Sequence, residues 1–248
     1  MKNKIFTIII SLVAIAMLAA CSQSDDALVV ATDAAFPPFE FVDEDSKEIV
    51  GFDVDLMNAI AEKANLDIRF QNVAWDPLLA GMAECQYDIA ISAITILPER
   101  AEQFGFSDPY INAGQIVAVA TDNDSIGGPG DLVGATIGAQ IGTTGAMEAE
   151  AIADSTVKVY DTYELAFLDL MNGQIDAVVA DYPTAVAFVN QNADSLKVVG
   201  EVFTDENYGI AFCKGNDELI SQVNTALAEL KAEGFIEDLV VTWYGTAE

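Results

Sequence analysis

The chain has 248 residues, of which 52% are hydrophobic, and its 40 Asp and Glu outweigh 10 Lys and Arg, giving a formal net charge of −30 at pH 7. This charge argues against nucleic acid and anionic lipid heads as partners, because phosphate groups attract Lys and Arg. The chain contains no histidine, which excludes Ser-His-Asp and Cys-His catalysis and His-ligated metal sites.

The N-terminus has the pattern of a bacterial export signal. Two lysines precede an apolar run over residues 5–18, which is shorter than the roughly 20 residues that span a membrane. The run ends in Leu-Ala-Ala-Cys at Cys21, which looks like a lipobox. We therefore expect residues 1–20 to be a lipoprotein signal peptide, and Cys21 to carry lipid at the start of a polar tether, residues 21–26. An uncleaved anchor helix is the alternative.

The next segment alternates expected strands and helices. Strands are expected over residues 28–32, 67–71 and 89–92, of which the first and the last are apolar. Helices are expected to begin near Asp53 and Asp76, each of which is a residue type that caps helix N-termini, and a proline follows Asp76.

A loop rich in Gly, Pro and Asp over residues 122–131 separates a second run of alternating elements. One more strand is expected before this loop, at residues 116–120. After the loop, expected strands lie at residues 135–139, 157–160, 177–180, 197–199 and 208–212, and expected helices at 142–152, 163–172, from 183 onward, 217–233 and 235–244. Repeated strand–helix units imply parallel sheets and the α/β class. The length allows one large domain or two of about 110 residues each.

Two cysteines, Cys85 and Cys213, follow Cys21 and have neither a CxxC nor a metal-site spacing. They are either buried small hydrophobes or one disulfide, and the sequence leaves this open. No motif for a metal or a cofactor is present, so neither is expected.

Arg100 is the most informative single residue. It lies just beyond a buried strand, in a segment that reads Thr-Ile-Leu-Pro-Glu-Arg, and ligands of parallel sheets bind beyond the carboxyl ends of strands. A guanidinium there can hold a carboxylate through two parallel hydrogen bonds. The alternative is an ordinary arginine at a helix start, paired with Glu99 or Glu102.

Other residues at strand ends suggest the rest of a binding site. Gly142-Thr143-Thr144-Gly145 follows a strand and opens a helix, whose N–H groups attract anions, although a tight capped turn explains it equally well. Asp33 and Asp181 also follow apolar strands and could hold an ammonium group or simply cap loops. Phe36 and Trp75, expected in loops after strands, could enclose an apolar stem or pack as core. Together these groups suit a free α-amino acid.

The chain resembles the bacterial extracellular solute-binding proteins of family 3, the amino-acid binders of ABC importers. The matching strings occur in the family's order between residues 28 and 245 and include Ala31-Thr32-Asp33, Pro38-Phe39-Glu40-Phe41, Gly51-Phe52-Asp53-Val54-Asp55-Leu56, Ala93-Ile94-Thr95-Ile96-Leu97-Pro98-Glu99-Arg100, Phe106-Ser107-Asp108-Pro109-Tyr110, Gly142-Thr143-Thr144, Gln174-Ile175-Asp176-Ala177, Asp181 and Tyr208-Gly209-Ile210-Ala211-Phe212.

The resemblance implies a two-lobed periplasmic-binding-protein-like fold (type II), with two hinge strands and the ligand in the interlobe cleft. Lobe 1 would comprise residues 27–112 and 208–248, and lobe 2 residues 113–207. The protein would be a monomer, held outside the cytoplasm by its lipid anchor, that delivers a free amino acid to the permease subunits of an ABC importer. A dehydratase-like enzyme and a ligand-sensing partner of a membrane receptor are the rival functions.

The resemblance also implies roles for individual residues. Arg100 would bind the ligand α-carboxylate with the backbone of Thr95 and Thr144, and Asp181 would bind the α-ammonium with the backbone of Ala93. The expected side-chain pocket and its neighbours comprise Asp33, Phe36, Trp75, Gln140 and Thr143, and Gln140 stands where some glutamine binders carry Lys. Because this set offers no second cation besides Arg100, the ligand side chain is expected to be neutral-polar or cationic, not acidic.

Overall fold

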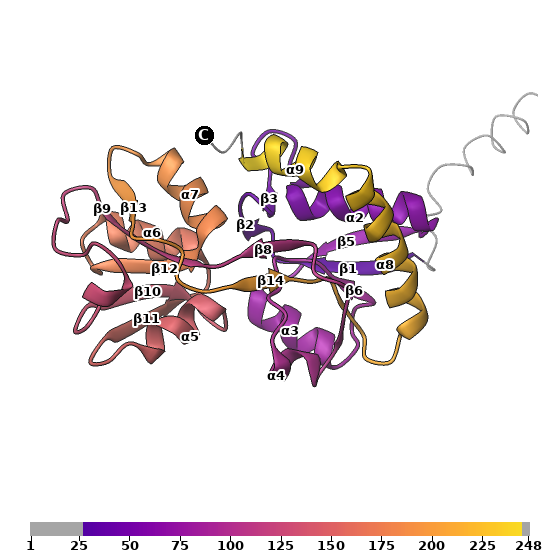
Figure 1. The fold of residues 1–248 in the computed structure, drawn as a ribbon, viewed down its shortest axis with the longest axis horizontal. Coiled ribbons are helices and arrows are strands. Elements are labelled where there is room, and N and C mark those ends of the chain that lie inside the picture. Colours follow the sequence, from indigo (N-terminus) through magenta and orange to yellow (C-terminus); the bar gives the residue numbers. More distant parts are fainter. Residues whose placement is uncertain (1–26, 245–248) are drawn as a thin grey trace, which may run out of the picture.

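The computed structural model describes residues 27–244. The expected signal peptide, Cys21 and the tether lie outside these residues. Two α/β lobes are placed side by side and joined through a narrow waist (Figure 1). Among residues 27–244, no helix is both long enough and apolar enough to cross a membrane.

The first lobe is built on a five-stranded sheet in the order β5-β1-β6-β15-β7. These strands span, in that order, Ile68–Asn72, Leu28–Thr32, Ile89–Ala90, Ala211–Phe212 and Gly105–Phe106. β1 is parallel to β5 and β6, whereas β15 is antiparallel to β6 and β7. A small antiparallel sheet lies beside it and comprises β2 (Ala35–Phe36), β3 (Glu40–Val42) and β4 (Ile49–Val50).

Five helices belong to the first lobe: α2 (Phe52–Ala64), α3 (Trp75–Ala83), α4 (Pro98–Ala101), α8 (Asp217–Ala232) and α9 (Phe235–Tyr244). α2, α8 and α9 pack on one another along one side of the sheet, and α3 and α4 lie on the other side (Figure 1). α8 buries Leu219, Val223 and Leu230 among its inward-facing residues, a helical spacing that explains why this acidic segment packs as an amphipathic helix.

The second lobe has a sheet in the order β11-β10-β12-β9-β13. Its strands span Thr156–Tyr160, Thr136–Gln140, Ala177–Asp181, Gln115–Ala120 and Leu196–Val199, and its helices are α5 (Thr144–Ala151), α6 (Tyr163–Met171) and α7 (Tyr182–Gln191), with a short 3₁₀ turn η1 at Pro129–Asp131. β10 is parallel to β11 and β12, and β9 is antiparallel to β12 and β13. All five residues of β12 are buried, as expected for a strand covered on both faces.

Two strands form the waist: β8 (Ile111–Ala113) and β14 (Glu206–Tyr208) pair antiparallel between the lobes (Figure 1). The expected two-lobed α/β fold is thus confirmed. The residues at which one lobe ends and the other begins stay a prediction.

Three details of the first lobe differ from the sequence predictions or complete them. Asp53 does not cap α2: the N-cap is Gly51, and Asp53 is fully buried in the first turn. Likewise the N-cap of α3 is Ala74 rather than Asp76. Cys85 and Cys213 form a disulfide, which joins the loop after α3 to the segment after β15.

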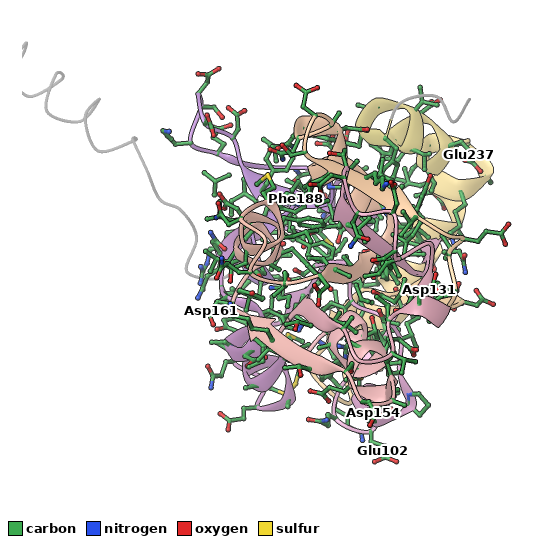
Figure 2. The ribbon with its side chains drawn as sticks, turned by 90° about the vertical axis from the view of Figure 1, so that its left-hand side faces the viewer. Glu102, Asp131, Asp154, Asp161, Phe188 and Glu237 are labelled. Carbon is green, nitrogen blue, oxygen red and sulfur yellow. A yellow bond between two sulfur atoms is a disulfide. The ribbon has the colours of Figure 1, made fainter. Side chains whose placement is uncertain are left out.

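Acidic side chains project from the ends and edges of the molecule. Figure 2 looks onto the second lobe and labels Glu102, Asp131, Asp154, Asp161 and Glu237, all of which are exposed. Their spread over the periphery fits a negative charge that serves solubility.

Candidate functional site

A small cavity lies between the lobes. The first lobe contributes Phe36, Trp75, Ser92, Ala93, Thr95 and Arg100 to its lining, and the second lobe contributes Gln140, Thr143, Thr144 and Asp181. All of these residues except Ser92 are among the predicted site residues. Asp33, the remaining predicted residue, does not line the cavity but bonds to Gln140, which does.

The lobes touch around this cavity, so the structure is a closed form. The Arg100 guanidinium donates to the Gly142 carbonyl at 3.1 Å, and the Gln140 amide donates to Asp33 at 3.1 Å. Gly142 has φ +70°, and a Cβ there would come within 2.6 Å of the Asp76 carboxylate in the other lobe. The positive φ is the feature that favours glycine here.

Arg100, in α4, is 5% exposed and has no acidic partner within 4.0 Å among residues 27–244. Its guanidinium donates to the Thr95 carbonyl at 3.0 Å and lies 5.3 Å from the centre of the Trp75 ring. Burial lowers the pKa of Arg100, while the charges of Asp181 and Glu206 oppose that effect. An arginine stays protonated in proteins, so a buried positive charge faces the cavity without a contacting anion. The alternative pairing with Glu99 or Glu102 is wrong.

Asp181 ends β12 on the opposite lobe and is 3% exposed. It accepts hydrogen bonds from the Tyr208 hydroxyl at 2.5 Å and from the Gln115 amide at 3.0 Å. Burial, followed by the nearby charge of Glu206, raises the pKa of Asp181 to about 7. Its side chain makes no capping bond to α7. Among residues 27–244, no Lys or Arg lies within 4.0 Å of this carboxyl group.

Asp33 follows β1 and is 6% exposed. Burial raises the pKa of its carboxyl to about 6, and the hydrogen bond from Gln140 opposes this. Gln140 also donates to the Asp161 carbonyl at 3.1 Å. Asp33 is thus connected to the cavity lining through Gln140.

Thr143 and Thr144 lie at the start of α5. The Thr143 hydroxyl caps the helix by accepting from the Ala146 N–H at 3.2 Å, and it donates to the Gln140 carbonyl at 2.8 Å. The capped turn that the sequence suggested is therefore present. A helix N-terminus that lines a cavity offers N–H groups and a partial positive charge to an anion. Anion binding by the start of α5 stays a prediction.

Phe36 and Trp75 line the cavity, although neither lies in a loop as expected. Phe36 is in β2, and Trp75 is the first residue of α3; both are more than nine-tenths buried. Phe36 also contacts Tyr163 of the second lobe, with 5.7 Å between ring centres. The Trp75 indole nitrogen has no hydrogen-bond acceptor within the described part of the chain. These rings are thus both part of the packing and part of the cavity wall.

Sequence reasoning missed a polar network beneath the cavity. Gln115, the first residue of β9, donates to Thr144, Asp181 and Glu206. Glu206, in β14, also accepts from the Thr95 hydroxyl at 2.9 Å. In the sequence, Gln115 and Glu206 are only polar residues at the starts of strands β9 and β14. That pattern alone does not indicate a binding site. Lys158 is exposed and paired with Asp169, and it does not line the cavity.

The charges at the site are unequal. Arg100 and Asp181 line the cavity, and the buried carboxyl groups of Asp33 and Glu206 bond to the lining residues Gln140 and Thr95. A search of residues 27–244 finds no cluster of three or more His, Cys, Asp or Glu that could hold a metal ion. Such a site suits a small ligand that brings one carboxylate and at least one cationic group.

Comparisons with known proteins agree with this architecture. The model of the "Bacterial extracellular solute-binding proteins, family 3" matches residues 28–246. The L-cystine-binding protein TcyJ of Escherichia coli (strain K12) is 31% identical over 220 residues, 88% of this chain and 82% of that protein. An arginine-binding periplasmic protein of Mannheimia haemolytica is 33% identical over 99% of both chains.

The fold of this chain also matches solved structures of amino-acid-binding proteins. The structure of the arginine-, lysine-, histidine-binding protein ArtJ from Geobacillus stearothermophilus aligns with a TM-score of 0.83 and 38% identity. The alignment covers 89% of this chain and 96% of that one.

Proposed function

The chain belongs to the bacterial extracellular solute-binding proteins of family 3, and from this premise we propose that it captures a free L-amino acid for an ABC importer. The relatives named above bind amino acids, by their names, and are not named as enzymes. The observation that carries the proposal is the buried Arg100 guanidinium, which faces an interlobe cavity without a contacting anion while Asp181 lies on the opposite wall.

The ligand main-chain groups fit this pair. Arg100 binds the α-carboxylate, helped by the backbone of Thr95 and by the start of α5 at Thr143 and Thr144. Asp181 binds the α-ammonium, together with the Ala93 carbonyl. Both interactions are charge-assisted hydrogen bonds in a site shielded from water, where they are about twice as strong as neutral ones.

The ligand side chain is cationic or neutral-polar. It lies between Phe36 and Trp75 and reaches Asp33 and Gln140. An acidic side chain would bring an unpaired carboxylate among carboxyl groups that already outnumber Arg100, and burying an unpaired charge costs several kcal/mol. Arginine, lysine, histidine and glutamine are the candidates that follow, and the arginine, lysine and histidine binding of ArtJ supports the cationic ones.

Ligand binding stabilises the closed form. The contacts of Arg100 with Gly142 and of Gln140 with Asp33 exist only when the lobes meet, and a ligand that touches both walls shifts the open–closed equilibrium toward closure. The importer's permease subunits then recognise the closed shape. The protein works as a monomer outside the cytoplasm, anchored by lipid on Cys21.

Two rival functions make different predictions. A dehydratase-like enzyme would convert its ligand, so recovery of unchanged amino acid after long incubation supports a binding protein. A ligand-sensing protein would co-purify with a membrane receptor instead of permease subunits.

A thermal-shift screen of residues 22–248 against all common amino acids tests the proposal. A ligand at 100 times its Kd stabilises by about 2.7 kcal/mol, which raises the melting temperature by several degrees for a chain of this size, at roughly 2–4 °C per kcal/mol. If no amino acid shifts the melting curve, the proposed function is wrong.

A further inference from the structure

Two buried acids lie directly behind the cavity wall. Glu40, in β3, and Asp53, in the first turn of α2, are both 0% exposed. In front of them are Ser92 and Ala93, which line the cavity. Ala93 has φ 47°, a left-handed conformation that non-glycine residues adopt only when their surroundings impose it.

Each acid holds one of these two cavity residues. The Ser92 hydroxyl donates to Glu40 Oε1 at 2.8 Å, and the Ala93 N–H donates to Asp53 Oδ2 at 2.8 Å. The Tyr110 hydroxyl donates to the same Asp53 oxygen at 2.9 Å. One oxygen of each carboxyl group therefore accepts hydrogen bonds from these neighbours.

The second oxygen of each group has no donor from elsewhere. Glu40 Oε2 and Asp53 Oδ1 are buried, and neither has a hydrogen-bond partner among residues 27–244. The two carboxyl groups are close enough for each to alter the pKa of the other: the charge of Asp53 raises the pKa of Glu40, and interaction with Glu40 lowers that of Asp53 against the larger effect of burial. Two ionised carboxylates so placed repel, whereas a carboxylic acid and a carboxylate form a hydrogen bond when one proton lies between them.

We propose that Glu40 and Asp53 share one proton, and that this acid pair is the positioning element that fixes Ser92 and Ala93 against the ligand. The effect on the ligand rests on the proposed function, but the shared proton does not. The Ser92 hydroxyl also accepts from the Asp33 N–H at 3.0 Å, so the pair is connected through Ser92 to the Asp33 backbone.

The surroundings favour a proton rather than a cation as the compensating charge. The titratable groups that face the pair are Asp33, beyond Ser92, and the phenols of Tyr110 and Tyr244. No Lys or Arg in the described part of the chain forms an ion pair with either acid. Burial, followed by the charge of Asp53, raises the pKa of Glu40 well above its usual range, and burial raises the pKa of Asp53 to about 7.

Amide substitutions test whether the pair holds one proton. Glu40→Gln imitates a protonated Glu40, since its NH₂ group donates to Asp53 while its oxygen accepts from Ser92. Asp53→Asn imitates a protonated Asp53, since its NH₂ group donates to Glu40 while its oxygen accepts from the Ala93 N–H. In the double variant two NH₂ groups face each other, and turning either amide leaves the Ser92 hydroxyl or the Ala93 N–H without its acceptor.

The test measures melting temperature without ligand and amino-acid affinity by calorimetry. Each single amide variant should stay folded and bind within about threefold of wild type. The double variant should bind at least tenfold more weakly, or about 1.4 kcal/mol, and melt lower than the two single effects predict. The control double variant Glu40→Gln with Asp88→Asn, which alters a first-lobe carboxyl group outside the pair, should show additive effects.

A pH series provides the second readout. The raised pKa means that the folded state keeps a proton that the unfolded state releases above about pH 4. Wild type should therefore lose stability relative to Glu40→Gln as pH rises from 5 to 8.5. Asp33 and Asp181 titrate in both proteins, so their effects cancel in this difference.

The proposal is overturned by parallel pH profiles of wild type and Glu40→Gln, by an additive double variant, or by a single amide variant that unfolds. If wild type binds no amino acid, the proposed function fails, while the melting curves still decide whether the proton is shared.

Discussion

At the residue scale, Arg100 places a buried positive charge in the wall of the cavity. Its charge is buried against carbonyl oxygens and an aromatic ring, an arrangement that a bound carboxylate completes. Arg100→Ala would leave the ligand carboxylate buried without a partner and should weaken binding by about 3–5 kcal/mol. Calorimetry measures this loss, and circular dichroism checks the fold. Arg69→Ala, which removes an exposed arginine of the same lobe, is the control, and equal affinities for both variants would contradict the assignment.

Asp181 should make ligand affinity depend on pH. Its folded pKa of about 7 exceeds the unfolded value of about 3.9. Without ligand, it contributes stability that is fully present below about pH 4 and is lost as pH rises through 7. An ammonium ligand requires the ionised form, so binding releases a proton below pH 7.

We therefore expect wild-type affinity to fall by up to about tenfold per pH unit below 7, with Asp33 adding to the slope at lower pH. Asp181→Asn should bind weakly and lose most of this dependence, whereas Asp154→Asn, at an exposed site, should keep it. Calorimetric titrations at pH 5.5, 6.5 and 7.5 measure the slopes. A flat wild-type profile would mean that Asp181 does not pair with the ligand.

Sequence reasoning located residues that are chemically unusual for their surroundings. Arg100 was found because cations are rare in this acidic chain and because it follows a buried strand. Gln115 and Glu206 were missed because a polar residue in a short strand has no pattern that separates a buried network from a solvent-exposed position. Asp53 was misassigned since an aspartate before an apolar helical pattern usually caps the helix. Its burial depends on Glu40, Ala93 and Tyr110, which are distant in the sequence.

At the element scale, long periodic segments were predicted well and short strands were not. α8 was expected over residues 217–233 and spans Asp217–Ala232. In contrast, the strand expected over residues 208–212 is divided between β14 and β15. β14 pairs with β8 in the waist and β15 with the first-lobe sheet, so the chain changes partners near Gly209. Tertiary contacts decide this division, and no local pattern encodes it.

The disulfide should stabilise the first lobe. Cys85 and Cys213 are separated by 128 residues, and cross-links over long loops restrict the unfolded chain strongly. We expect Cys85→Ala with Cys213→Ala to lower the free energy of unfolding by about 2–5 kcal/mol. Urea denaturation of residues 22–248 measures the change, and reduction of the wild type should reproduce it. An unchanged midpoint would show that the cross-link adds no stability.

The N-terminal segment makes a separate prediction. If Cys21 carries the lipid anchor, Cys21→Ser should lose radiolabelled acyl groups and move from the membrane fraction to the soluble fraction. A single acyl chain binds membranes only marginally, and two or more hold firmly. Ser22→Ala is the control and should remain in the membrane. Retention of Cys21→Ser there would instead indicate the uncleaved anchor helix.

At the scale of the whole molecule, the fold determines which residues meet. β1 ends before Asp33, while β10 and β12 end at Gln140 and Asp181. The carboxyl ends of these parallel strands, from separate sheets, face the same cleft. The two crossings at β8 and β14 let the lobes close on it (Figure 1). The sequence predicted which strand ends bear functional groups, but bringing Arg100 opposite Asp181 required the tertiary structure.

Calorimetric titration of the wild-type protein with arginine, lysine, glutamine and glutamate tests the central claim most directly. The cavity is lined by Arg100 and Asp181, and the buried carboxyl groups of Asp33 and Glu206 bond to its lining residues Gln140 and Thr95. It should therefore bind arginine, lysine or glutamine. Glutamate should bind at least ~100-fold more weakly, because an unpaired carboxylate costs several kcal/mol and each 1.4 kcal/mol is tenfold in affinity. If glutamate binds most tightly of the four, or if none of them binds, the account of this cavity is contradicted.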